Sequence, residues 1–271
     1  MEYLYPMCSR HTFLLGSCFI LEVRLNKKLL LFVILAFVFV SGLFFLQEFL
    51  KIDYTRISLP QFAPTLAYIV IVIIFKDLFI PINFKINRIV IVKLLFVIFI
   101  PLLMSLTSFF ICKLRNLDFI VNSDVSSLKA AFFGILMGAV GEEIGWRSFL
   151  QPSLDKKYPK IISCIIVGII WGVWHIPYFF FGPLYVISFI LFTISYSIVI
   201  LLILKNTQYN IVLSSVFHFS LNIGAWIFFN SNAENYNLTI SIINSIIWLI
   251  AAVIVIVTNK RYYFAKDRKT P

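Results

Sequence analysis

Residues 184–204 read LYVISFILFTISYSIVILLIL and contain no charged side chain. A helix needs about 20 predominantly apolar residues to cross the roughly 30 Å hydrocarbon core of a bilayer, and this run is long enough. Seven further apolar runs lie at residues 29–49, 59–75, 89–111, 128–150, 161–181, 211–229 and 240–257. The sequence therefore predicts an all-α fold, a polytopic transmembrane helical bundle with about eight membrane spans.

The overall composition agrees with this prediction. Of the 271 residues, 61% are hydrophobic and 13% are charged, whereas a soluble domain averages roughly 45–50% apolar and 25% charged residues. This excludes an ordinary soluble globular protein and leaves no stretch long enough for a separate soluble domain. We expect a cytoplasmic or interfacial lead over 1–28, a membrane bundle over 29–258 and a basic cytoplasmic tail over 259–271.

The charge balance indicates orientation rather than a nucleic-acid partner. The chain has 23 Lys and Arg residues against 12 Asp and Glu, but its cations are spread over many short loops instead of forming one basic face. Membrane proteins gather Lys and Arg in their cytoplasmic loops, and here most of them fall on the side that holds both termini. The sequence predicts a multi-pass cell-membrane protein with both termini in the cytoplasm, a lipid bilayer as partner and no nucleic acid.

The cysteines do not form a recognisable site. Cys8, Cys18, Cys112 and Cys164 are scattered and contain no CxxC pair, so we interpret them as small apolar residues rather than metal ligands or disulfides.

Ionisable and polar side chains inside three of the apolar runs are the candidate functional residues. An ionisable group in hydrocarbon is costly and usually faces a cavity or a partner. The fourth run contains Gly141-Glu142-Glu143-Ile144-Gly145-Trp146-Arg147, the fifth contains Trp171-Gly172-Val173-Trp174-His175, and the seventh contains His218-Phe219-Ser220-Leu221-Asn222. Two of the three histidines of the chain are therefore predicted to lie in mid-span.

Helical spacing relates these residues to one another. Residues four apart share a face, so Glu143 can pair with Arg147, and His218 lies on the same face as Asn222. Glycines four apart, Gly134 with Gly138 and Gly168 with Gly172, allow helix backbones to approach closely. The polar side chains of the three helices are thus expected to converge on one pocket.

Each pair taken alone also has a structural interpretation. Glu143 with Arg147 can be a buried ion pair, and His218 with Asn222 can be a packing contact between helices. Glu142 is harder to explain in this way, because it adjoins a second carboxylate and has no basic residue four positions away. Such surroundings suit a general base that works near neutral pH.

The three motifs resemble those of the CPBP (Abi) group of intramembrane proteases, which includes CAAX prenyl protease type 2, lysostaphin-resistance-protein-A-like proteins and bacteriocin-processing or immunity proteins. That family has a Glu-Glu-xxx-Arg motif, an aromatic-xxx-His motif and a His-xxx-Asn motif on successive core helices. All three occur here in order, within a core of about residues 128–225. Trp171 stands where phenylalanine is more usual.

The resemblance implies hydrolysis of a peptide bond in a membrane-associated protein or peptide. Glu142 would activate a water molecule, and His175 would help to hold the water or transfer its proton. His218 and Asn222 would stabilise the oxyanion, while Glu143 and Arg147 would fix the geometry. We expect no cofactor and no bound metal. The alternative is a catalytic zinc held by Glu142, His175 and His218.

Two other functions remain open at this stage. One is bacteriocin self-immunity or binding by a member of the same family with little proteolysis. The other is a proton-coupled transporter that uses the Glu–His cluster as a relay, although such transporters are commonly built from internal repeats and we find none in the sequence.

Overall fold

The computed structural model describes residues 12–54, 56–117, 125–229 and 237–265, and for 12–26, 125–128 and 130 it describes the backbone alone. Over these ranges all regular structure is helical, which confirms the predicted all-α fold. The elements are α1 (Thr12–Leu50), η1 (Leu59–Phe62), α2 (Ala63–Ile74), η2 (Lys76–Leu78), α3 (Arg88–Leu114), α4 (Val125–Gly145), η3 (Trp146–Leu150), α5 (Gln151–Asp155), α6 (Lys160–Trp174), η4 (Ile176–Phe181), α7 (Pro183–Leu204), α8 (Ile211–Phe229), α9 (Leu238–Thr258) and α10 (Lys260–Phe264).

Within the described residues, five helices are long and apolar enough to cross a membrane, which makes this a membrane protein. They are 27–50 within α1, then α3, α7, α8 and α9. The predicted runs 59–75 and 161–181 contain shorter apolar helices, at Leu59–Ile74 and Lys160–Trp174. The run 128–150 contains α4, which is not among the five. Thus helices occupy all eight predicted runs, but a count of eight spans is not established.

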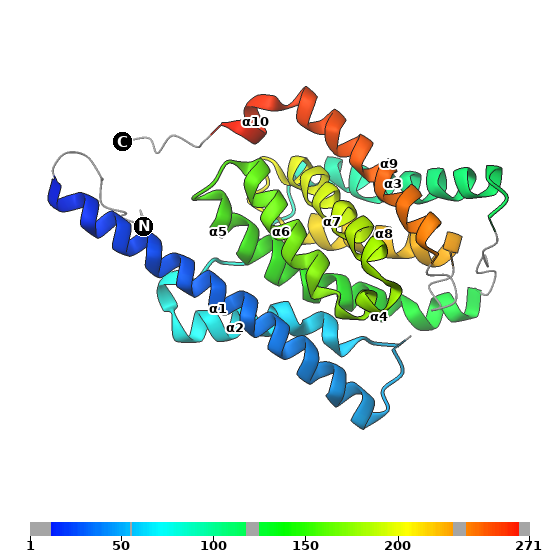
Figure 1. Ribbon diagram of the computed structural model, residues 1–271, viewed down its shortest axis with the longest axis horizontal. Coiled ribbons are helices and arrows are strands. Elements are labelled where there is room, and N and C mark those ends of the chain that lie inside the picture. The colour runs from blue at the N-terminus through cyan, green and yellow to red at the C-terminus, as the bar shows by residue number, and fades with distance from the viewer. Residues whose placement is uncertain (1–11, 55, 118–124, 230–236, 266–271) are drawn as a thin grey trace.

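The bundle places α4, α6, α7 and α8 between two outer groups of helices. Helices α1 and α2 lie side by side along one edge, and α3 and α9 lie together toward the opposite edge (Figure 1). Helix α1 begins at Thr12, inside the predicted lead, and continues into the first span without a break. The short helix α10 occupies the start of the predicted tail.

Proline explains why the fourth run is not a regular helix. In a helix interior, a proline removes one backbone donor and its ring clashes with the carbonyl four residues earlier. Before Pro152, the chain forms the π-helical turn η3, in which the N–H of Gln151 donates to the carbonyl of Trp146, five residues back. This wide turn keeps the chain helical up to Asp155, beyond the predicted end at residue 150.

Proline also ends the fifth predicted run early, and this corrects the mid-span position predicted for His175. Helix α6 stops at Trp174, and His175 is its C-cap, with φ −76° and ψ 62°. Pro177 has no backbone N–H to continue the helix, and its ring would clash with the carbonyl of Val173, four residues earlier. The chain continues as the short 3-10 segment Ile176–Phe181.

Glycine allows two of the central helices to approach closely. A Cβ built on Gly168 of α6 would lie 2.5 Å from the Cα of Ile194 on α7, so only glycine fits there. The predicted role of this position in helix packing is confirmed.

Buried thiols also lie in the bundle. Cys112 and Cys164 are buried and free, which agrees with their interpretation as small apolar residues. The side chains of Cys8 and Cys18 lie outside the described part of the chain.

Candidate active site

Glu142 has both carboxylate oxygens occupied by N–H donors from other parts of the bundle. Nε1 of Trp171, on α6, donates to Oε2 at 2.7 Å. Nε2 of Gln61, on η1, donates to Oε1 at 3.0 Å. The Glu142 side chain is almost fully buried, and each of its oxygens has one N–H donor from the protein.

Glu143 forms the centre of a second polar group. Its Oε2 lies 3.5 Å from Nε of Arg147, one helical turn later, as the sequence spacing predicted. Its Oε1 lies 3.1 Å from Nδ1 of His218 on α8. The hydroxyl of Tyr196 on α7 also points to Oε1, at 3.4 Å. Three helices therefore meet at one buried carboxylate.

Arg147 lies in the π-helical turn and is almost completely buried. Its Nη2 donates to Oγ of Ser197 at 3.2 Å. Its guanidinium carbon lies 5.3 Å from the Trp171 ring centre and 5.4 Å from that of Tyr196, which are cation–π distances. The charge is thus balanced by Glu143 and by two aromatic faces.

His175 is held by the end of its own helix. Its Nδ1 lies 2.8 Å from the carbonyl oxygen of Trp171. Because a carbonyl can only accept, we assign the proton of the neutral ring to Nδ1, which leaves Nε2 with a free lone pair. The ring stacks on Tyr178 at 5.4 Å between centroids.

The Trp171 indole connects the two groups. Besides its bond to Glu142, its ring lies 5.7 Å from that of His175 and 5.4 Å from that of His218. The structure therefore brings five of the six predicted site residues together. Glu142, Arg147, His175 and His218 lie next to the Trp171 side chain, and Glu143 contacts Arg147 and His218. The sixth, Asn222, follows His218 by one turn of α8, but no contact in the described part of the chain links it to the other five.

Exposure differs among these six residues. Glu142, Glu143, Arg147 and His218 are buried, whereas His175 and Asn222 are partly exposed.

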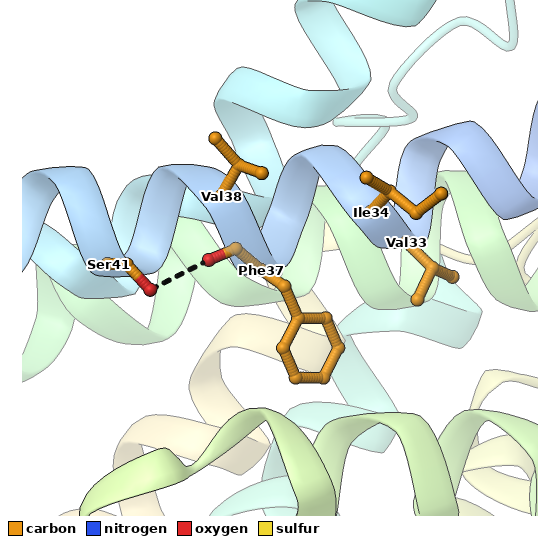
Figure 2. A pocket seen from close by; sticks show the side chains of 5 residues that line it. All are labelled: Val33, Ile34, Phe37, Val38 and Ser41. Carbon is orange, nitrogen blue, oxygen red and sulfur yellow. Dashed lines mark hydrogen bonds between the residues drawn. The ribbon is translucent and has the colours of Figure 1, made fainter.

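A separate apolar groove on α1, lined by Val33, Ile34, Phe37, Val38 and Ser41, includes none of the site residues (Figure 2).

The alternative zinc site is not assembled as a ligand set. Among the described residues, no group of three His, Cys, Asp or Glu side chains is arranged to hold a metal ion. Both Glu142 oxygens accept N–H bonds instead. The residues present therefore do not fit a zinc ion in this arrangement.

Two contributors were missed by reasoning from the sequence. Gln61 and Tyr196 are uncharged, and the search for site residues followed ionisable groups and their helical neighbours. Gln61 could have been noticed as an amide near the start of the second apolar run, where an unpaired amide would be costly.

A buried Glu–Arg–His constellation thus lies inside a membrane bundle, beside a second carboxylate. Residues 124–224 match the family described as Type II CAAX prenyl endopeptidase Rce1-like, and this segment holds all three motifs. The resemblance predicted from the motifs is therefore confirmed.

The individual relatives are distant. The chain is 27% identical over 147 residues to CAAX prenyl protease 2 of Methanococcus maripaludis, covering 49% of this chain and 51% of the relative. It is 28% identical over 172 residues to lysostaphin resistance protein A of Staphylococcus haemolyticus, covering 61% and 47%. It is 29% identical over 171 residues to the protein of that name in Staphylococcus epidermidis, covering 60% and 44%. The chain thus spans about half the length of the curated relatives it matches. These matches give no support to metal-dependent proteolysis or to bacteriocin immunity.

Proposed function

We propose that this protein is an intramembrane endopeptidase that hydrolyses a peptide bond by means of a water molecule activated by Glu142. The observation that carries the proposal is the contact of the Trp171 indole with the Glu142 carboxylate and with both imidazoles. A carboxylate and two imidazoles drawn from three helices supply the base and the hydrogen-bonding groups that peptide hydrolysis needs.

The chemical step needs only protein groups and water. Glu142 takes a proton from water as the water oxygen attacks the carbonyl carbon of the substrate. The tetrahedral intermediate then collapses, the C–N bond breaks, and the proton on Glu142 passes to the leaving amine. His175, with Nδ1 engaged by the Trp171 carbonyl, has Nε2 free to accept a hydrogen bond from the water.

His218 and Asn222 would stabilise the negative oxygen of the intermediate. Because Nδ1 of His218 donates to Glu143, its Nε2 carries a proton only when the ring is cationic. The carboxylate of Glu143 favours that form, and Arg147, 3.5 Å from the other oxygen of Glu143, holds this carboxylate in position. Glu143 and Arg147 therefore act through His218 and do not touch the reacting atoms.

The substrate in this proposal is a membrane-associated protein or peptide. The partial exposure of His175 and Asn222 supports an approach of the substrate past these two side chains. A relative is named CAAX prenyl protease 2, which makes a lipid-modified carboxyl terminus one substrate to test.

The topology in this proposal has eight spans with both termini in the cytoplasm. Its support is the uneven distribution of Lys and Arg among the loops. Reporter fusions at residue 271 and in the loop after α3 test it: the C-terminal fusion should report cytoplasm and the loop fusion the opposite side. Two reporters on the same side would contradict the five spans that this topology places between them.

The decisive experiment compares peptides released from membranes that contain the wild-type protein or Glu142→Gln. The variant keeps the size and hydrogen bonding of the side chain but removes the base, so peptide release should fall to background. Glu48→Gln, an exposed change on α1, is the matched control and should cleave normally. A Glu142→Gln protein that is folded and still releases the same peptides would refute the proposal.

A further inference from the structure

Trp171 and Gln61 differ from the other groups around the site because they touch the proposed base directly and carry no charge. Each uses one N–H to occupy one oxygen of Glu142, at 2.7 and 3.0 Å. We infer that they are positioning residues, which fix the orientation of the Glu142 carboxylate and stabilise its charged form. This inference rests on the proposed function and adds two residues to it.

The Trp171 bond depends on the indole. Phenylalanine, the residue more usual at this position of the motif, has no N–H to donate. The ring contacts with His175 and His218 need only an aromatic face, but the bond to Oε2 needs Nε1. In this chain, Trp171 therefore packs against the two imidazoles and also donates a hydrogen bond to Glu142.

The Gln61 bond brings a segment outside the family match into the site. Gln61 lies in η1, more than 60 residues before residue 124, where the match begins. Its side chain fits because position 138 is glycine: a Cβ there would lie 2.0 Å from Oε1 of Gln61 and 2.4 Å from Cδ. Gly138 thus provides the space in which the Gln61 amide reaches Glu142.

The two donors together have a predictable effect on the base. A carboxylate that accepts hydrogen bonds is favoured in its charged form, and two bonds on different oxygens also restrict its rotation. Loss of either donor should therefore slow hydrolysis and make Glu142 easier to protonate. A residue that only fills space would slow the reaction without moving its pH dependence.

The test measures pH–rate profiles for Trp171→Phe and Gln61→Met, each of which removes the N–H donor. We expect kcat to fall roughly ten- to a hundredfold, the range for losing a hydrogen bond to a charged group, and the acidic limb to move to higher pH. Replacing Trp171 by benzothienylalanine, which has sulfur in place of the indole N–H, should reproduce both effects while keeping the ring size. An unmoved acidic limb in all three variants would overturn the inference.

Trp248→Phe provides the matched control. Trp248 is completely buried, and its Nε1 has no hydrogen-bond partner among the described residues. This change therefore removes a similar volume and no bond seen in that part of the chain. Its profile should keep the wild-type acidic limb. If the acidic limb of Trp248→Phe moves by the same amount, the effect of Trp171→Phe is due to packing and the inference is overturned.

A second readout separates this inference from the proposed function. In protein labelled with ¹⁵N-tryptophan, the Trp171 indole resonance is identified by its loss in Trp171→Phe, and it should move upfield in Glu142→Gln as the bond weakens. A resonance that does not respond to Glu142→Gln overturns the inference, even in an active enzyme. A resonance that responds in a protein without Glu142-dependent cleavage overturns the proposed function and leaves the bond established.

Discussion

Glu143 and His218 are 75 residues apart in the sequence, yet the carboxylate and the imidazole meet at 3.1 Å in the centre of the bundle. The same carboxylate faces Arg147, so one buried carboxylate contacts both an arginine and a histidine. We therefore expect Glu143 to contribute to the stability of the fold as well as to the orientation of His218.

Substituting Glu143→Gln should destabilise the protein by about 3–5 kcal/mol, because it leaves the buried Arg147 without its counter-charge. Thermal unfolding in detergent measures this loss. Asp77→Asn is the control: it breaks the exposed pair between Lys28 and Asp77, where a loss below about 1 kcal/mol is expected. Similar losses in the two variants would contradict the assigned burial of the Glu143–Arg147 pair.

Substituting Gly168→Ala should separate α6 from α7. The new methyl group would meet backbone atoms of Ile194 at 2.5 and 2.7 Å, and these cannot turn aside as a side chain can. Overpacking of this kind costs about 1–3 kcal/mol. Gly42→Ala on α1, where no atom of the described part of the chain lies within 4 Å of the added Cβ, should leave the unfolding temperature unchanged or raise it slightly. A tolerated Gly168→Ala would show that these helices are less closely packed.

Asp155 should make stability depend on pH. Burial raises the pKa of its carboxyl, although bonds from Tyr209 and Gln151 oppose the shift. Because the pKa in the folded state lies above that in the unfolded state, stability is lost as pH rises from the ordinary range near 3.8 through the raised value. Asp155→Asn cannot ionise, so its unfolding free energy should vary less over this window. If the unfolding free energy of the variant depends on pH as steeply as that of the wild type, the pH dependence comes from another group.

Metal removal should leave proteolysis unchanged. Both oxygens of Glu142 already accept N–H bonds, and the described residues offer no three-ligand group. Cleavage by the purified protein, before and after exhaustive chelation, checks this. Loss of activity that returns when zinc is added would reverse this conclusion and support the set Glu142, His175 and His218.

The sequence was informative where a residue type is costly in a membrane. Glu142, Glu143 and His218 were found because charge or imidazole stands out in an apolar run, and the spacing of Glu143 and Arg147 predicted their contact. Gln61 was missed because its importance comes from tertiary contact with Gly138, which local spacing does not encode. The helix end at His175 was missed because apolar composition alone does not separate α-helix from the 3-10 turn that Pro177 imposes.

The wide turn at Trp146–Leu150 affects how this chain can be engineered. It holds one residue more than a regular turn, so positions after it are rotated by about 100° relative to α4. A helical wheel drawn straight through from Glu142 would place Gln151 and Asp155 on the wrong side. Deleting one residue after Arg147 in this turn would restore the regular phase and turn the end of the helix away from Tyr209, even though every motif residue would still be present.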